Sequence, residues 1–558
     1  MKILSILKKE IQYKSNTQLF SLLSIALGAI AFMIIYGITP LNVTNDSWIM
    51  AGYDENDILQ HYAGWLAFRA SDWDFPIGMA NKMAVGDGTF ISFTDSIPWI
   101  AIIFKIFRSI LPETFQYFGI YTLLCYMLQG FAGFKILYYT TKNLKYSLAG
   151  TILFCFSPIL MERAFRHTAL GSQWLILFSI YIYFKHRDIF SYIHYVLLIL
   201  LEILSVGIHP YFLPMIACFS LLCLFQDIYR KKWGSVLFFL AGLIVSYAAG
   251  YLIGALGTGV SVERIGYGYF SMNINAILNP DSRGGYTWSY FLKTRPQTLG
   301  NYDGFNYLGI GIILLAFMVF FLLLSFSSWH STIRSLKNYV PLIIICVFLF
   351  CFSISNTITW NDKILITIPL PEILQKICDI FRASSRLFYP VYYLIYIFLL
   401  TCLWYNRYDI KQKSLTIMLT TIIIVQLCDL HQVIIQKHMS MNEAQKQNSI
   451  LQDDILSLVG DTHNEILLDN CDFDLHPLAI WAFKHNMNTY FSLVHSAYIS
   501  AALGEQNLLT IKNKKDLGDS VIISTDENTM HWYLNNTNAA IYEYSSGYFI
   551  YTPKSKAQ

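Results

Sequence analysis

Residues 18–38 read QLFSLLSIALGAIAFMIIYGI, an apolar run that decides the class of fold. Four lysines precede it, at positions 2, 8, 9 and 14. A helix of about 20 apolar residues can cross a bilayer, whereas the apolar core of a signal peptide has only about 7–15. We therefore expect a first membrane-spanning helix that is retained in the mature protein.

The composition of the whole chain agrees with this first helix. Hydrophobic residues make up 55 % of the 558 residues, charged residues 13 %, and the mean hydropathy is +0.45. Such a balance excludes a soluble enzyme, a disordered chain, a coiled coil and a small disulfide-rich module. The net charge of +3 creates no basic field for nucleic acid. Nine of the ten cysteines lie in or beside apolar runs, which indicates packing and not a disulfide or metal framework.

Eleven apolar runs are long enough to cross, or nearly cross, a bilayer core of about 30 Å. They are 18–38, 116–139, 146–160, 168–184, 191–206, 211–229, 234–256, 306–326, 339–355, 388–405 and 413–429. A twelfth run, 97–111, is short and contains Lys105 and Arg108, so we interpret it as an amphipathic helix lying flat on the outer surface. The expected fold is a polytopic α-helical membrane protein with about eleven spans.

The distribution of Lys and Arg gives the orientation. With eleven spans, the short inner connectors carry these residues at more than three times the density of the outer segments. The positive-inside rule then predicts an inner N-terminus and an outer C-terminus. The large polar segments 39–115, 257–305, 356–387 and 431–558 all fall on the outer side.

The chain divides into a membrane domain, 1–430, and an outer tail, 431–558. The tail contains short apolar runs at 465–469, 520–524 and 540–544, which indicate strands, and a stretch at 475–503 that we interpret as helix. We expect this tail to be a small α/β domain.

The first outer loop concentrates acidic residues near its start. It contains nine carboxylates against four bases, and Asp54, Asp57 and Asp95 are the candidates for chemistry. From Asn56 the apolar residues recur at helical spacing, so the same carboxylates also suit a plain structural role at a helix N-terminus.

Five short stretches resemble the GT-C superfamily of membrane glycosyltransferases, which use polyprenyl-linked sugars, and look most like a bacterial branch of it. They are YDENDILQHYAGW (53–65), FTDSIP (93–98), FQYFG (115–119), SPILMERAFRH (157–167) and FRASSRLFYP (381–390). The likeness covers roughly 18–405. It implies a GT-C-like bundle with a large first outer loop, in the bacterial inner membrane, that transfers a sugar with inversion. The donor would be a polyprenyl phosphate or diphosphate, and the acceptor an extracytoplasmic glycan, glycolipid or protein.

The resemblance also assigns roles to residues. The catalytic base of such enzymes is usually an aspartate early in the first loop, which corresponds to Asp54, with Asp57 second and Asp95 third. Positive side chains would hold the departing phosphate, because arginine binds phosphate bidentately. The candidates are Arg163, Arg166, His167, Arg382 and Arg386. Each arginine is also compatible with anchoring a helix at the interface.

Further residues are candidates for substrate binding. They are His61, Trp65, His209 and Arg264. Trp65 and the other loop aromatics also suit the aromatic belt of a membrane protein, and His209 before Pro210 suits a turn. The resemblance requires no cofactor, although the acidic stretch 54–57 could hold Mg²⁺ or Mn²⁺ through oxygen ligands.

Two other functions fit the same pattern. A polymerase or ligase of lipid-linked polysaccharide of the O-antigen type would place its catalytic arginines in 257–305, with Arg264 foremost. A lipid-glycan flippase or transporter would require charged residues within the spans, and the spans contain few, such as Lys135 and Glu202.

Overall fold

A computed structural model describes most of the chain. The described residues are 2–55, 57–85, 88–257, 267–282, 284–325, 337–406, 412–444, 462–469, 475–490, 499–543 and 549–554. Arg264 lies outside these ranges, so its predicted role has no structural counterpart below.

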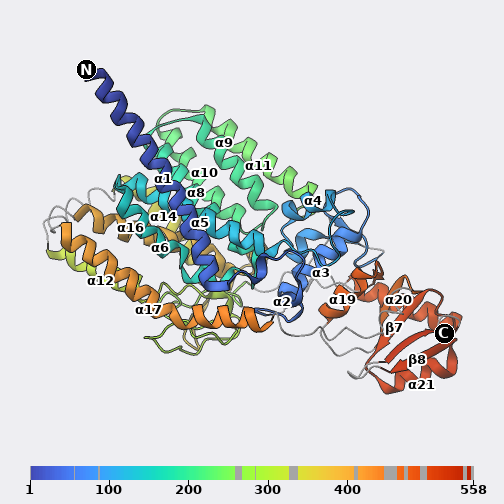
Figure 1. Ribbon diagram of the computed structural model, residues 1–558. Coiled ribbons are helices and arrows are strands. Elements are labelled where there is room, and N and C mark those ends of the chain that lie inside the picture. The colour runs from blue at the N-terminus through green and yellow to red at the C-terminus, as the bar shows by residue number, and fades with distance from the viewer. Residues whose placement is uncertain are drawn as a thin grey trace.

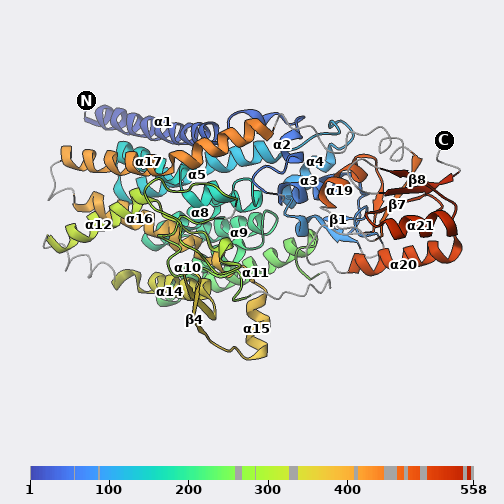
Figure 2. The same ribbon diagram turned by 90° about the horizontal axis from the view of Figure 1, so that it is seen from below.

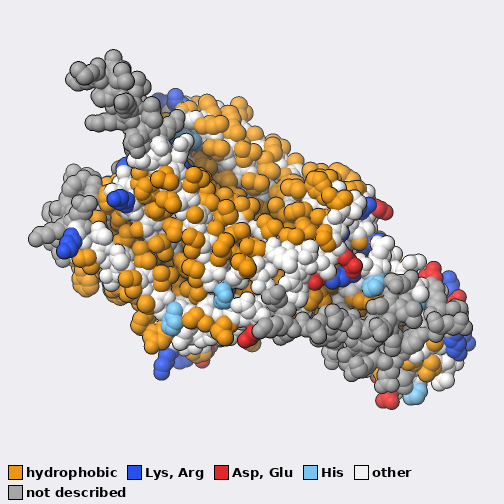
Figure 3. Space-filling view, viewed as in Figure 1, with side chains coloured by type: hydrophobic (Ala, Val, Ile, Leu, Met, Phe, Trp, Pro, Cys, Tyr) orange, Lys and Arg blue, Asp and Glu red, His pale blue; other side chains and the backbone are white. Residues whose placement is uncertain are grey.

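Long helices form the larger part of the molecule (Figure 1). They are α1 (Lys2–Tyr36), α5 (Phe118–Thr141), α6 (Leu144–Cys155), α8 (Trp174–Asp188), α9 (Tyr192–Val206), α10 (Phe212–Tyr229), α11 (Gly234–Leu252), α12 (Ile310–Ser325), α14 (Val340–Ile354), α16 (Tyr389–Tyr405) and α17 (Gln412–Ala444). Hydrophobic side chains cover the visible face of this bundle, while acidic and basic side chains gather at its ends and on the C-terminal part (Figure 3). This distribution is typical of a helical membrane protein.

Seven helices in the described part of the chain are long and apolar enough to cross a membrane. They are Ser15–Tyr36, Phe118–Thr141, Phe212–Tyr229, Gly234–Leu252, Lys337–Ile354, Ser384–Tyr405 and Lys413–Ala444. The other four predicted spans are also helices, but each has 16 residues or fewer. The structure therefore supports a helical membrane protein with seven clear candidate spans, and the count of eleven stays a prediction.

The segment expected to lie on the surface is α4 (Pro98–Ile106), a helix of nine residues. Nine residues rise only about 14 Å, too little for a bilayer core. Its Lys105 points inward, where Nζ lies over the ring of Phe68 at 3.9 Å and donates to the carbonyl oxygen of Asp72 at 3.1 Å. Ile103 and Ile106 on the same helix are exposed.

The first loop and the connections at the same end of the bundle consist of short elements. They are η1 (Thr39–Leu41), α2 (Ser47–Met50), α3 (Asp57–Ala70), β1 (Met79–Ala80), β2 (Thr89–Phe90), η2 (Ile91–Thr94), α7 (Pro158–Arg163), η3 (Thr168–Gly171) and η4 (Asn301–Gly304). Others are β3 (Thr357–Trp360), β4 (Lys363–Thr367), α15 (Glu372–Asp379) and η6 (Ser384–Phe388). At the opposite end of the bundle, η5 (Lys337–Tyr339) precedes α14, and its Tyr339 ring packs against the guanidinium of Arg187. The predicted helix after Asn56 is confirmed as α3, whose inward face is buried.

The C-terminal unit is a mixed sheet with helices. It comprises β5 (Glu465–Leu468), α19 (Leu475–Lys484), β6 (Asn488–Thr489), α20 (Ile499–Lys514), β7 (Ser520–Ser524), α21 (Glu527–Asn536), β8 (Ala539–Glu543) and β9 (Phe549–Pro553). The strand order is β6-β5-β7-β9-β8, with β6, β5 and β7 parallel and β9 antiparallel to both neighbours. The three predicted strands are confirmed, since they correspond to β5, β7 and β8.

The structure modifies two predictions about the tail. The helix expected over 475–503 is confirmed at its two ends, 475–484 in α19 and 499–503 in α20. Between them Asn486 adopts a φ of 57°, Asn488 and Thr489 pair with β5, and 491–498 lie outside the described residues. The expected boundary at 431 falls inside α17, which continues to Ala444. The apolar run 413–429 covers only the first part of α17, and the helix continues through the more polar residues that follow.

The C-terminal unit is attached to the first loop (Figures 1 and 2). Lys484 of α19 lies 2.7 Å from Asp46 Oδ2, which also accepts a hydrogen bond from the Tyr62 hydroxyl at 3.0 Å. Thr489 and residues 82–85 exchange backbone hydrogen bonds, with Val85 N donating to Thr489 O and Thr489 N to Lys82 O. The loop and the unit therefore share a short run of strand pairing.

Helices α1 and α5 touch backbone to backbone. A Cβ built at Gly28 would lie 2.1 Å from the carbonyl oxygen of Tyr126, and one built at Gly130 would lie 2.3 Å from that of Ser24. Small residues on facing helices allow this approach, which is how helices pack inside a membrane.

We expect Gly28→Ala to lower the free energy of unfolding by about 1–3 kcal/mol, because the added methyl group forces the two backbones apart. Thermal unfolding of the protein in detergent measures the effect. Gly504→Ala in α20 is the matched control, because its Cβ meets no atom within 4 Å. Unchanged stability of Gly28→Ala would contradict this packing.

Candidate functional site

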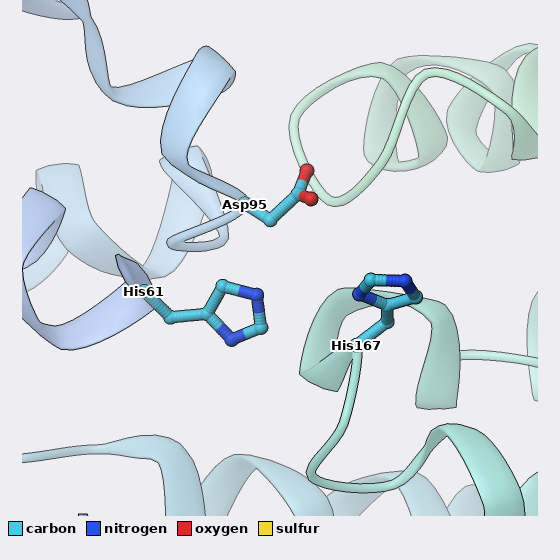
Figure 4. A group of neighbouring side chains, drawn as sticks. All are labelled: His61, Asp95 and His167. Atoms are coloured by element: carbon cyan, nitrogen blue, oxygen red, sulfur yellow. The ribbon is translucent and has the colours of Figure 1, made fainter. Parts of the chain in front are cut away.

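Side chains from four separate segments meet at the end of the bundle that carries the first loop. His61, Asp95 and His167 point toward one another (Figure 4), and the ligand-type atoms that they offer all lie within 4.8 Å of one another. Asp57 and His209 flank them. We call these five residues the His–Asp cluster.

Local backbone geometry places the members of the cluster. Asp57 and His61 lie one turn apart on α3 and therefore share a face. Asp95 follows η2 with a φ of 55°, in the left-handed region. The next residue, Ser96, donates through Oγ to the carbonyl oxygen of His61 at 2.6 Å. This bond ties the turn that carries Asp95 to the helix that carries His61.

Hydrogen bonds and close contacts orient the imidazoles. His167 Nδ1 lies 3.1 Å from Asp57 Oδ2. His209 Nδ1 accepts from the backbone N–H of Tyr211 at 3.2 Å, so its proton sits on Nε2, which lies 3.6 Å from Asp95 Oδ1. His61 Nδ1 lies 3.5 Å from the hydroxyl of Thr168.

The surroundings keep the histidines neutral. Burial, and then the nearby His476 of α19, lower the pKa of His61 to about 3. Burial and the guanidinium of Arg386 hold the pKa values of His167 and His209 well below 6.5. At pH 7 the three rings therefore offer lone pairs and do not carry positive charge.

The pKa of Asp95 is shifted upward, whereas those of the histidines are shifted downward. Burial raises the pKa of Asp95 to about 6, against the lowering effect of Arg386 and Arg382. About 30 % of its side chain remains exposed, as does 35 % of Asp57 and 19 % of His167. These three groups are therefore open to a ligand.

Beneath the cluster, Asp303 forms a buried ion triplet with two arginines. Its Oδ1 accepts from Arg163 at 3.0 Å, and its two carboxylate oxygens accept from Arg386 at 3.0 and 2.9 Å. The hydroxyl of Tyr389 accepts from Arg163 Nε at 2.9 Å. Burial alone would raise the pKa of Asp303, but the two guanidinium groups outweigh it and hold that pKa well below its usual range.

Asp54, the first choice for the catalytic base, lies outside the cluster in a second buried network. Its side chain is fully buried, with Oδ2 2.6 Å from Lys437 Nζ and Oδ1 3.5 Å from Arg166. Arg166 also pairs with Glu162 and Glu55 and donates to the hydroxyl of Ser282 at 3.1 Å. A base must touch its substrate, and the burial and pairing of Asp54 do not favour that role.

The predicted phosphate ligands fall into two groups. Arg163, Arg166 and Arg386 are held in the buried networks just described, although Arg386 also lies beside Asp95. Arg382 lies beside Asp95 outside these networks, with its guanidinium 5.6 Å from the Phe270 ring. Trp65 is fully buried and donates from Nε1 to the carbonyl oxygen of Phe115 at 3.0 Å. Its predicted contact with substrate is not supported by this position, because the ring packs in the core.

Two important residues were missed in the sequence. Asp303 stands alone in a polar loop, and Lys437 belongs to the stretch that was assigned to the tail. The sequence offers only an indirect indication of these two residues, namely that buried cations on the outer side need acidic partners. The partners themselves lie far away in the sequence. Arg163 and Asp303 are 140 positions apart, and Lys437 and Asp54 are 383 positions apart.

A family model described as "Domain of unknown function (DUF6311)" matches residues 25–431. This range includes every member of the His–Asp cluster and both Asp303 and Asp54. A search of curated proteins gives no match.

We expect Asp303→Asn to destabilise the protein by about 3–5 kcal/mol, because it leaves two buried guanidinium groups without their carboxylate. Thermal or denaturant unfolding in detergent measures this loss. Asp362→Asn is the control, since Asp362 is exposed and such surface changes usually stay within about 0.5 kcal/mol. Equal stability of the two variants would show that the triplet does not hold the fold.

Proposed function

The chain belongs to the family described as Domain of unknown function (DUF6311), and we propose that it is a membrane glycosyltransferase. It transfers a sugar, with inversion, from a polyprenyl phosphate or diphosphate to an extracytoplasmic glycan, glycolipid or protein. One observation carries the proposal. The stretches 53–65, 93–98, 157–167 and 381–390, on which the resemblance to GT-C enzymes rests, contribute side chains to a single site.

Asp57 is the proposed catalytic base. It is the more exposed carboxylate of the His–Asp cluster, and His167 at 3.1 Å orients it. A base must come within about 2.6–3.2 Å of the hydroxyl that it deprotonates, which the buried Asp54 cannot do without breaking its pair with Lys437. Asp57, second in the sequence-based ranking, therefore takes the role first given to Asp54.

The proposed reaction is a single displacement at the anomeric carbon. The acceptor oxygen forms a bond to that carbon while its proton moves to Asp57. The bond from the carbon to the phosphate oxygen breaks, and the phosphate leaves with the electron pair. Arg382 and Arg386, beside Asp95, stabilise the charge that develops on this leaving group.

The membrane placement follows from the charge distribution and the apolar bundle. We propose that the protein resides in a bacterial inner membrane, with an inner N-terminus and the His–Asp cluster at the outer leaflet, where a lipid-linked donor presents its head group. The C-terminal unit then lies outside and shapes access of the acceptor. A cleft of about 590 Å³ lies where the two parts meet, lined by Arg69 and Arg108 of the first loop and by Lys484 of α19.

We expect Asp57→Asn to lower kcat by about 10²–10⁴-fold, the usual contribution of a general base. The assay is sugar transfer by detergent-purified protein from a defined polyprenyl-linked donor. Asp72→Asn is the control from the same loop, since its side chain is 93 % exposed. Full turnover of Asp57→Asn would remove Asp57 as the base.

We expect Arg382→Gln to raise the KM for the donor by about 10–100-fold, because a hydrogen bond to a charged group contributes about 1.5–3 kcal/mol. The KM for the acceptor should change little. Arg295→Gln, in an exposed part of another outer segment, serves as the comparison. A selective rise in the KM for the acceptor would assign Arg382 to the other substrate.

A further inference from the structure

Three members of the His–Asp cluster, His61, Asp95 and His167, have the composition of a metal site, although they lie at least 34 positions apart in the sequence. One ring nitrogen from each of His61 and His167 and one carboxylate oxygen from Asp95 lie within 4.8 Å of one another. Figure 4 shows the three side chains directed into one common space. Because the three ligands are so far apart in the sequence, no short spacing motif identifies them.

The distances suit closure onto one ion. A tetrahedral Zn²⁺ binds nitrogen and oxygen at about 2.0–2.2 Å, which places its ligand atoms roughly 3.4 Å apart. Contraction from the observed separation requires side-chain movements of roughly 1 Å, within the same rotamer wells.

The residues around the ligands match the second shell of a metal site. Histidines that bind metal usually have a carboxylate or other acceptor near the second ring nitrogen. Asp57 supplies a carboxylate 3.1 Å from His167 Nδ1, and Thr168 supplies a hydroxyl 3.5 Å from His61 Nδ1. His209, with its proton on Nε2, faces Asp95 Oδ1 at 3.6 Å and can hold that carboxylate in place.

We propose that His61, Asp95 and His167 bind one transition-metal dication, with Zn²⁺ preferred over Mg²⁺ and Ca²⁺. Two imidazoles and one carboxylate are the ligands of a zinc site with an open position, whereas Mg²⁺ and Ca²⁺ select oxygen ligands. The open position takes a water molecule or an anionic oxygen such as that of a phosphate. This differs from the Mg²⁺ or Mn²⁺ site expected on the acidic stretch 54–57, whose Asp54 is paired with Lys437. It does not depend on the proposed glycosyl transfer.

Metal content of the full chain tests the proposal. Protein purified in detergent is stripped with a chelator, incubated with Zn²⁺ or Mg²⁺ alone, freed of excess ion and analysed by mass spectrometry. We expect one retained Zn²⁺ per chain and no retained Mg²⁺. His61→Gln and His167→Gln should lose the zinc, while His531→Gln, an exposed histidine of α21, should keep it.

Two further readouts apply if a ligand variant fails to fold. Asp57→Asn leaves the ligands intact and should weaken Zn²⁺ binding by about 10–100-fold, the usual effect of a second-shell change. Wild-type protein loaded with Co²⁺ should give the visible spectrum of a tetrahedral nitrogen and oxygen site without thiolate charge transfer, which excludes the free cysteines. Wild-type protein that retains no zinc, or a thiolate spectrum, would overturn the proposal.

Discussion

The carboxylate of Asp303 between Arg163 and Arg386 is the interaction on which the site depends. Taking guanidinium and carboxylate groups out of water costs several kcal/mol for each ion, so such a group is tolerable only when its hydrogen bonds are satisfied. Here Tyr389, Ser385 and the backbone of Asp303 complete them. The triplet joins α7, η4 and η6, three segments from different parts of the chain. The positions of His167 and Arg386 follow from it.

A second buried network, formed by Asp54, Lys437 and Arg166, holds the start of the first loop in place. Asp54 adopts a φ of 59°, a conformation that costs of order 1–3 kcal/mol and persists only where neighbouring contacts enforce it. Lys437 and Arg166 supply those contacts from α17 and from the connection after α7. The two networks are buried, whereas Asp57, Asp95 and His167 keep part of their surface exposed. A rigid frame thus presents a small number of accessible groups, as pre-organised sites require.

Much of the architecture could be predicted from local patterns. Apolar runs of about 20 residues, the helical spacing after Asn56 and the short apolar runs of the tail each depend on neighbours in sequence, and the corresponding α1, α3, β5, β7 and β8 agree. The sequence could predict which residue types form the candidate site, but not which role each residue takes. Whether a carboxylate faces a lysine, as Asp54 does, or stays partly open, as Asp57 does, is decided by contacts across hundreds of residues. The break of the helix at Asn486 depends likewise on pairing with β5.

The backbone pairing of Thr489 with Lys82 has a consequence for biosynthesis. The two residues are 407 positions apart, and at about 5–20 residues per second a ribosome needs roughly 20–80 s to pass from one to the other. During that interval the early loop exists without the strand that completes its edge and without Lys437. A chain interrupted before that point therefore carries an unfinished first loop, which chaperones and proteases can recognise.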